Sequence, residues 1–465
     1  MKLNYKRVIL VGMAFMFITA FWQAYDAIVP VILTYHFGLP HTASGAVMAV
    51  DNVLAVFLLP IFGALSDKVR TKMGKRTPFV LFGTLAATAS FIALTFIDNY
   101  QLANVVAQGI SSSGDLSEEA VRELTMQLTL QNPLPFVGFI ATLLVVLVAM
   151  ATFRSPAVAL MPDVTVKPLR SKANAIINLT GTAGGIIVLG LGAAFSTADN
   201  YYMQYTGYVT AVVAVMLAGL LVFMISVKEN KWAAEMEAQS AAMGLDDLPA
   251  EESQSSGSRK LSRSELRSLL LILASVALWY IGYNSITSKY SVYAMGILKF
   301  DYNYTLIVAQ AAAIVSYIPI GIISSRFGRK KTILAGIIML AAAFGSGFFV
   351  TADTPEAIMY PIFALAGIGW ATINVNSFPM AVELARGGDI GKYTGYYYTA
   401  SMAAQIIAPI LSGVFYDAFG MQNTFFPFGT LFVIFSFVTM LFVRHGDSKP
   451  TPVKNKLEAL GVDMD

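Results

Sequence analysis

Long apolar runs recur along this 465-residue chain and restrict its fold more than any other feature. Runs of about 20 residues are long enough to cross the hydrocarbon core of a bilayer. Every backbone polar group there needs a partner inside the protein, so each run must form a helix or part of a closed barrel. Continuous runs of this length predict helices. We place twelve, at residues 8–34, 44–66, 78–98, 135–155, 173–195, 206–227, 268–288, 304–325, 332–351, 356–378, 394–416 and 423–443.

The composition supports a membrane protein and excludes several kinds of site. Hydrophobic residues make up 56% of the chain and charged residues only 13%, whereas a soluble chain carries about 25% charged residues. The chain has no cysteine, which excludes disulfides, thiol nucleophiles and thiolate metal sites. Its three histidines, His36, His41 and His445, are too scattered for a metal cluster. The first run is too long for a signal peptide and lacks a cleavage site, so we interpret it as a retained span.

The placement of basic residues predicts the orientation in the membrane. All but three of the 31 Lys and Arg residues fall at the termini or in alternate loops, the exceptions being Arg122, Lys289 and Lys299. Basic loops stay on the cytoplasmic side. Both termini and the loop at 228–267 are therefore expected to be cytoplasmic.

This pattern divides the chain into two six-helix halves. We expect an N-terminal half at 1–227, a cytoplasmic linker at 228–267, a C-terminal half at 268–445 and a tail at 446–465. The linker is rich in Ser, Ala and Glu and predicts a mobile segment with one surface helix near 231–243. The external loop at 99–134 predicts a short amphipathic helix at 116–130, which is either an ordered cap or a helix on the outer surface.

Two basic, glycine-containing loops occupy matching positions in the halves. Residues 63–76 read GALSDKVRTKMGKR, and residues 321–331 read GIISSRFGRKK, 258 positions later. Each joins two apolar runs, which indicates a protein built by duplication.

These loops resemble the signature of the major facilitator superfamily, Gly-x-x-x-Asp-Arg/Lys-x-Gly-Arg/Lys-Arg/Lys. The first copy has four extra residues, 70–73, and this longer form is similar to glycoside–pentoside–hexuronide:cation symporters and sucrose:proton symporters. The second copy has Ser325 in place of the acidic residue. Residues 154–170 resemble the glycoside–pentoside–hexuronide pattern Pro-x-x-Ala-Leu-x-Pro-x-x-Thr…Arg, and residues 25–41 resemble the first span and loop of the sucrose symporters.

The resemblance implies an all-α major facilitator fold with twelve helices in two pseudo-symmetric halves. It also implies transport by alternating access, with the substrate and proton sites near the midplane between the halves. Some glycoside relatives carry an acidic residue in the fourth span and an arginine in the fifth. Here the fourth span, at 135–153, carries no charge, and the fifth offers only Asn174 and Asn178.

Asp26 and Asp51 are the leading candidates for ion coupling. Of the 28 acidic residues, only these two fall well inside predicted spans. A charge in the bilayer costs a few kcal/mol or more, so an intramembrane carboxylate is a functional candidate by default. Such a group can take up a proton on one side and release it on the other. The structural alternative is that either carboxylate only bonds neighbouring helices.

The residues around Asp26 suit a sugar. Trp22 lies four positions before Asp26, so both share one helix face. An aromatic ring can cover the apolar face of a sugar while the carboxylate accepts from its hydroxyls. Trp22 could equally be a packing residue, and each mid-membrane amide or phenol could equally join helices. The predicted substrate-binding residues are Trp22, Gln23, Tyr25, Asp26, Asn178, Tyr280, Asn284, Trp370 and Asn374.

Three loops are expected to gate the cytoplasmic side. Glycine permits close helix approach. Asp67 can pair with a basic residue and accept from a helix N-terminus. We expect Arg154 or Arg170 to pair with Asp163 or Asp67; the alternative is that the basic residues only set the topology. The predicted gating residues are Gly63, Asp67, Lys75, Arg76, Arg154, Asp163, Arg170, Arg326 and Arg329.

These features favour a secondary active transporter that couples proton entry to uptake of a neutral glycoside or disaccharide. Sodium coupling is an alternative, for which Asp51 and Asn52 could supply two oxygens. Export of small amphipathic compounds and a non-transporting membrane sensor are further alternatives. An enzyme is not expected, since the chain has no HExxH, Gly-x-Ser-x-Gly or phosphate-binding loop. We expect no cofactor besides the coupling ion H⁺, no metal, no nucleic acid partner, and a monomer in the lipid bilayer that binds a small sugar.

Overall fold

The computed structural model describes residues 3–110, 118–166, 169–242, 262–382 and 390–446, and within these ranges its regular structure is helical. Twelve of the helices in the described parts are long and apolar enough to cross a membrane. The predicted all-α fold with twelve spans is therefore confirmed. The linker residues 243–261, for which the sequence predicted mobility, and the tail residues 447–465 lie outside the described residues.

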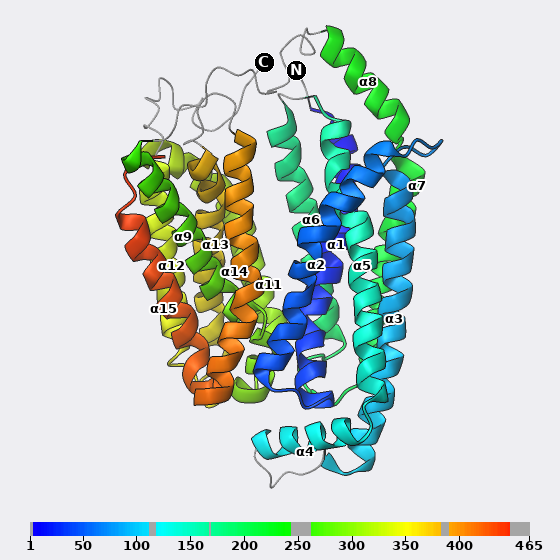
Figure 1. The fold of residues 1–465 in the computed structure, drawn as a ribbon, viewed down its shortest axis with the longest axis vertical. Helices are drawn as coiled ribbons and strands as arrows, with labels where there is room; N and C mark the ends of the chain where they lie inside the picture. Colours follow the sequence, from blue (N-terminus) through cyan, green and yellow to red (C-terminus); the bar gives the residue numbers. More distant parts are fainter. Residues whose placement is uncertain (1–2, 111–117, 167–168, 243–261, 383–389, 447–465) are drawn as a thin grey trace. The chain divides into compact units, whose positions relative to one another are not determined.

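The described chain forms two compact units (Figure 1). Unit 1 comprises Met1–Ala250 together with Ala294–Tyr304. Its elements are α1 (Tyr5–Val31), the π-helix η1 (Ile32–His36), α2 (His41–Lys68), α3 (Thr77–Ala107), α4 (Glu118–Gln131), α5 (Leu134–Asp163), α6 (Arg170–Ala194), α7 (Thr206–Ser226), α8 (Glu229–Ala242) and the π-helix η4 (Ala294–Leu298).

Unit 2 comprises Glu251–Tyr293 and Thr305–Asp465. Within it α9 packs against α14 and α15, and α12 packs against α13 and α15. A capping box starts α9, since Ser262 and Glu265 each accept from the other's backbone N–H. Its elements are α9 (Arg263–Thr287), α10 (Tyr290–Tyr293), α11 (Tyr302–Phe327, which begins in unit 1), α12 (Arg329–Gly347), the 3-10 helix η5 (Glu356–Ile358), α13 (Met359–Val382), α14 (Ile390–Phe419) and α15 (Met421–Leu441).

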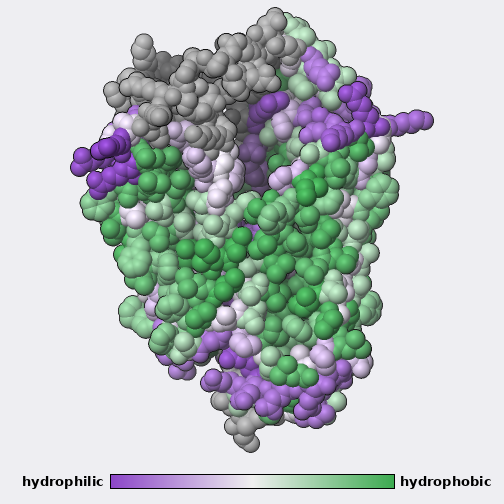
Figure 2. All heavy atoms as spheres, viewed as in Figure 1, coloured by the Kyte–Doolittle hydropathy of each residue, from purple (hydrophilic) through white to green (hydrophobic). Residues whose placement is uncertain are grey.

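The surface carries the polarity that a bilayer requires. Hydrophobic side chains cover the middle of the helices and hydrophilic ones gather at their ends (Figure 2). Large apolar side chains such as Phe82 and Phe96 on α3 are more than 60% exposed. Exposed apolar surface on this scale is stable only against lipid.

Helix α1 lies at the centre of unit 1, packed against α6 and α7. It contains Pro30, and the chain passes into the π-helix η1 directly after it. Proline removes a helical hydrogen bond, and π-helical turns occur often at functional sites. The C-terminal end of α1 is therefore an interrupted helix, which continues through η1 to His36.

The two short helices expected outside the spans are present. Helix α4 covers the end of η1, where Thr129 donates to the carbonyl of Phe37 over 3.0 Å. Gly38 has φ +69°, and a Cβ there would meet the α4 backbone at Met126 N, 2.3 Å away. Helix α8 lies at the opposite end of unit 1, beside the N-terminus (Figure 1).

Glycines bring α6 close to α1. A Cβ at Gly184 would lie 2.6 Å from the carbonyl oxygen of Met16, whereas a Cβ at Gly190 on the same helix meets nothing within 4 Å. Gly184 therefore serves close packing of α6 against α1.

This difference predicts opposite outcomes for two matched substitutions. Gly184→Ala forces the α1 backbone away and lowers the free energy of unfolding by about 1–3 kcal/mol. Gly190→Ala raises it by up to about 1 kcal/mol, because alanine fits the open space and favours helix. Thermal unfolding of the purified variants in detergent measures both. Equal melting temperatures would show that α6 does not rely on this contact.

Candidate functional site

Asp26 is the only exposed side chain between residues 10 and 39. The helix around it forms the core of unit 1, with Tyr25 buried and Trp22 and Gln23 half-buried. A carboxylate on an otherwise covered apolar helix is open to solute or water.

Asp51, on α2, lies close to Asp26. It is half-buried, its Oδ1 accepts from the side-chain amide of Asn52 over 2.8 Å, and its charge acts on Asp26. The two intramembrane carboxylates, 25 residues apart in sequence, are thus brought into one site. Their role in ion coupling stays a prediction.

Arg154 lies in this site and not in a loop. The uncharged stretch predicted for the fourth span ends at residue 153, but helix α5 runs on to Asp163, so Arg154 is inside a membrane-spanning helix. Its guanidinium lies 5.6 Å from the centre of the Trp22 ring and its charge acts on Asp51. The expectation that this span carries no charge is therefore wrong, and so is the expected pairing of Arg154 with Asp163 or Asp67.

Trp22 and Tyr25 line the same site with aromatic rings and polar atoms. Their ring centres are 5.3 Å apart in an edge-to-face arrangement, and Phe21 packs on both. The indole Nε1 of Trp22 and the hydroxyl of Tyr25 are buried and make no hydrogen bond within the described residues. Buried donors are normally satisfied, so these two mark a place where a ligand or water belongs.

Unit 2 holds a second aromatic cluster, formed by α9 and α13. The rings of Tyr283 and Trp370 stack 3.7 Å apart and nearly parallel, and Tyr280 meets Trp370 edge-on at 5.3 Å. Tyr280 also hydrogen-bonds Tyr397 of α14, whose hydroxyl lies 2.8 Å from that of Ser377. Tyr280, Tyr283 and Trp370 are half-buried, as expected for a wall that a flat ligand can contact.

The predicted asparagines are tied mainly to their own helices. Asn284 donates to the carbonyl of Tyr280 and Asn374 to that of Trp370, each on its own helix. Asn178, on α6, is exposed and donates to the carbonyl of Asn174. Among the described contacts none joins Asn178 to Trp22 or Asp26, so the structure does not bring it into that site.

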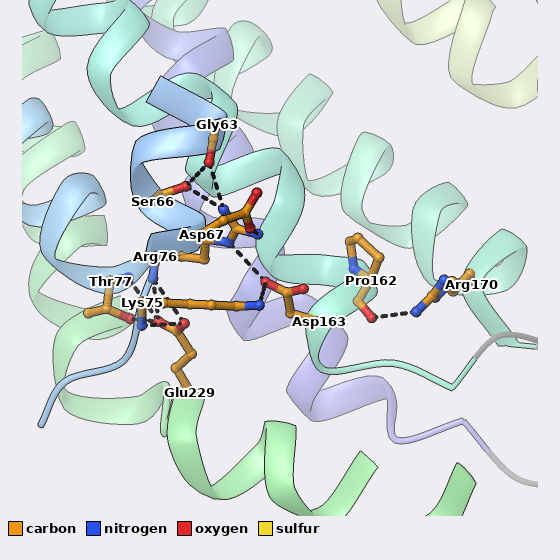
Figure 3. Close-up of polar contacts among 10 residues, drawn as sticks. All are labelled: Gly63, Ser66, Asp67, Lys75, Arg76, Thr77, Pro162, Asp163, Arg170 and Glu229. Carbon is orange, nitrogen blue, oxygen red and sulfur yellow. Dashed lines mark hydrogen bonds and ion pairs between the residues drawn. The ribbon is translucent and has the colours of Figure 1, made fainter. Parts of the chain in front are cut away.

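At the α8 end of unit 1, Arg76 joins three helices (Figure 3). Its Nε donates to Asp163 of α5 over 2.9 Å, and its other nitrogens bond Asp67, Ser66 and the carbonyl of Gly63, all on α2. The side chain is nearly buried, and both carboxylates balance its charge. Lys75 adds a second contact to Asp163, at 3.1 Å.

Glu229, the first residue of α8, caps the start of α3. Its carboxylate accepts from the backbone N–H groups of Lys75, Arg76 and Thr77 and from the Thr77 hydroxyl, over 2.7–3.2 Å. A carboxylate there satisfies orphan donors and opposes the positive end of the helix dipole. Gly74 makes room for it, because its φ is +123° and a Cβ would lie 2.1 Å from Glu229 Oε2.

The remaining predicted gating residues bond backbone carbonyls or are exposed. Arg170 donates to the carbonyls of Thr165 and Pro162, not to Asp163 or Asp67 as expected. In unit 2, Arg326 is exposed and Arg329 donates to the carbonyl of Pro379 over 3.4 Å.

Sequence reasoning missed two functional candidates. Glu229 falls in a polar segment that predicted a linker, and only its contact with residues 75–77 reveals its role. His36 and Asp98 form a fully buried pair in unit 1, with Nδ1 and Oδ1 2.6 Å apart. Asp98 was placed at the end of a predicted span, but α3 continues to Ala107. A prediction that extended the third helix through the polar residues after 98 would have placed Asp98 inside a helix.

Comparison with known families agrees with this architecture. The family model of the Major Facilitator Superfamily matches residues 11–318 and 296–462. The chain belongs to the Major Facilitator Superfamily. This superfamily assignment confirms the broader of the expected resemblances, while the glycoside and sucrose branches stay a prediction. A search of curated proteins gives no match.

Solved structures of superfamily transporters share the fold. The inward-open xylose transporter XylE from E. coli is 13% identical, with 98% of each chain covered and a TM-score of 0.60. A POT family transporter in complex with 5-aminolevulinic acid is 11% identical, with 94% of this chain and 95% of that chain covered and a TM-score of 0.64. A variant of the nucleoside transporter NupG is 12% identical, with 95% and 100% covered and a TM-score of 0.57. The chain is thus a multi-pass membrane protein with a fold that supports secondary transport.

Proposed function

We propose that this protein couples the movement of protons to the transport of a neutral glycoside or disaccharide. The observation that carries the proposal is the site of Asp26, Asp51 and Arg154, which lies beside two unsatisfied aromatic donors inside the membrane-spanning helices of unit 1. Among structures with this fold are a xylose transporter and a D-xylose–proton symporter. Both are too distant in sequence to assign the substrate.

The charge balance of the site favours Asp26 as the group that binds the proton. Two carboxylates and one guanidinium leave one negative charge uncompensated. Because Arg154 acts on Asp51, Asp51 is the carboxylate that it neutralises. Asp26, which is exposed, is then the one that must bind a cation to leave the low-dielectric site neutral. A proton on Asp26 also turns it from an acceptor into a donor toward a sugar oxygen.

The aromatic residues provide the surface for a sugar. Within unit 1, Trp22 and Tyr25 offer an indole N–H and a hydroxyl. Within unit 2, taken by itself, the stacked pair of Tyr283 and Trp370 offers a flat face. Pyranose rings present an apolar C–H face and a polar rim, and aromatic walls with a few donors match both. A neutral substrate suits a site whose own charges are already paired.

The network at Arg76 would act as a latch that holds the α8 end of unit 1 together while access alternates. It ties α2, α3, α5 and α8 through charge-assisted hydrogen bonds. With the basic loops on the cytoplasmic side, as the placement of Lys and Arg predicts, the latch and both termini would face the cytoplasm.

Uptake measurements with a panel of disaccharides test the proposal. Proteoliposomes that contain the protein are given an inward proton gradient or an inward sodium gradient, and entry of labelled sugar is followed with internal pH. We expect accumulation of at least one sugar with the proton gradient and a matching internal acidification. Accumulation that requires the sodium gradient instead would make sodium the coupling ion, with Asp51 and Asn52 as its candidate ligands. If no sugar enters but amphipathic dyes are extruded, the exporter alternative replaces the glycoside proposal.

Substitution of Trp370 tests the aromatic wall. Trp370→Ala removes the partner that stacks on Tyr283, and we expect KM for the sugar to rise about tenfold, since about 1.4 kcal/mol of stacking is lost. Trp370→Phe keeps a ring and should raise KM less. Proton binding at Asp26 should be unaffected, so the coupling ratio stays constant. An unchanged KM in Trp370→Ala would remove this cluster from the substrate site.

A further inference from the structure

A buried histidine–aspartate pair lies in unit 1, apart from the site of Asp26. His36 ends η1 and Asp98 lies on α3, and both side chains are fully buried. The imidazole contacts two oxygen atoms: Nδ1 lies 2.6 Å from Asp98 Oδ1, and Nε2 lies 2.7 Å from the carbonyl oxygen of Tyr201. Tyr201 belongs to the connection between α6 and α7, residues 195–205.

These contacts fix the number of protons on the pair. A carbonyl oxygen only accepts, so Nε2 must carry a hydrogen that it donates to Tyr201. The short contact at Nδ1 then needs a second hydrogen, either on Nδ1 or on Asp98. Without it, the nitrogen lone pair would face a carboxylate oxygen at 2.6 Å. The geometry therefore holds one proton more than a neutral imidazole beside an ionised carboxylate.

Two further buried polar atoms lie at the pair. Asp98 Oδ2 and the hydroxyl of Tyr205 are buried and make no hydrogen bond within the described residues, and the two groups interact electrostatically. Buried polar atoms of this kind are commonly met by internal water. The ionisable groups that face the pair or its contact groups come from η1, the α6–α7 connection, η4 and α11: Tyr35, Tyr201, Tyr202, Tyr205, Lys299 and Tyr302. Two other elements contact η1. Helix α4 contacts it through the hydroxyl of Thr129, which does not titrate near neutral pH, and α2 begins with the ionisable residue His41.

The pair connects three segments that are distant in sequence. Gln101 of α3 donates to the carbonyl of His36 over 3.0 Å, so η1 is fixed to α3 by two bonds. The bond from Nε2 then attaches the α6–α7 connection to both. We propose that His36 and Asp98 form a proton-binding site that fixes the α6–α7 connection to η1 when the proton is bound and releases it when the proton leaves.

A cysteine reporter tests this site without a substrate. Because the chain has no cysteine, Ala198→Cys places a single thiol in the α6–α7 connection, at a half-buried position. The maleimide labelling rate of the purified protein in detergent is measured from pH 5.5 to 9 and divided by the rate for Glu237→Cys, an exposed position on α8. This division removes the ordinary rise of thiol reactivity with pH.

We expect the ratio to rise about tenfold in one step as the pH increases, because loss of the proton frees the connection. Asp98→Asn should remove the step and keep the ratio low, since its amide donates to Nδ1 without titrating. His36→Gln should also remove the step. The chain has only two other histidines, so His41→Gln and His445→Gln serve as controls and should keep it. A labelling ratio that does not change with pH in the parent protein would overturn the proposal, and this result does not depend on any variant at His36. A step that survives in His36→Gln would also overturn it.

Discussion

Asp26→Asn is expected to abolish sugar accumulation against a gradient while leaving exchange of sugar across the membrane intact. The amide keeps the size and a hydrogen-bond donor of the protonated carboxyl group, but it cannot release a proton. With Asp26 neutral, Asp51 and Arg154 balance each other, so the site is neutral in every state. Transport should then proceed as facilitated diffusion, with counterflow close to the parent's and internal acidification reduced at least tenfold.

The charge-balance argument predicts the other members of a mutant cycle. Asp51→Asn leaves Arg154 and Asp26 to neutralise each other, so this variant should also lose proton-driven accumulation. Asp51→Asn combined with Arg154→Gln leaves Asp26 as the only charge. The site again needs a proton to become neutral, and we expect the double variant to recover coupling that the single variant lacks.

Recovery in the double variant is the decisive observation, because an unspecific loss of folding or rate cannot produce it. Accumulation and counterflow are measured on the same proteoliposome preparations, with the amount of folded protein set by size-exclusion chromatography. If Asp26→Asn still accumulates sugar, the proton is carried by Asp51. If both single variants accumulate sugar normally, neither carboxylate couples the ion.

Glu229→Ala is expected to detach α8 from the rest of unit 1. The carboxylate satisfies three backbone N–H groups and one hydroxyl at the start of α3. Hydrogen bonds to a charged group contribute about 1.5–3 kcal/mol each where the partner is left buried. Asn230, the next residue, donates to the carbonyls of Thr71 and Lys72 in exposed hydrogen bonds. We expect these bonds to be lost together with the contacts of Glu229, so that the start of α8 separates from the loop.

Hydrogen exchange at residues 69–77 and 229–242 measures this separation. We expect amide protection at the start of α3 and along α8 to fall at least tenfold in Glu229→Ala, and the melting temperature to decrease. Glu237→Gln, on the exposed face of α8, is the matched control and should change neither. Gly74→Ala should reproduce the effect with Glu229 intact, because its Cβ occupies the space of the carboxylate. Normal protection in both variants would show that α8 is held by other contacts.

The length and spacing of apolar runs determined the membrane-spanning helices. In hydrocarbon a backbone must satisfy its hydrogen bonds within the segment, so an apolar run of sufficient length specifies a helix from local information alone. The same local reasoning found Asp26 and Asp51, since a carboxylate inside such a run is visible in the sequence. It also found α4 and α8, because their polar sequences carry helix signals between spans.

Only the tertiary structure decided which polar groups meet. Arg154 was assigned to a loop because the apolar run ends before it, whereas α5 continues for about two more turns and places its guanidinium by Trp22. Arg76 takes both Asp67 and Asp163, and Glu229 reaches it across more than 150 residues of sequence. His36 and Asp98 meet because η1 packs against α3. Hydropathy specifies where a membrane-spanning helix lies in the chain, but the partners of buried charges depend on helix packing, which no single segment encodes.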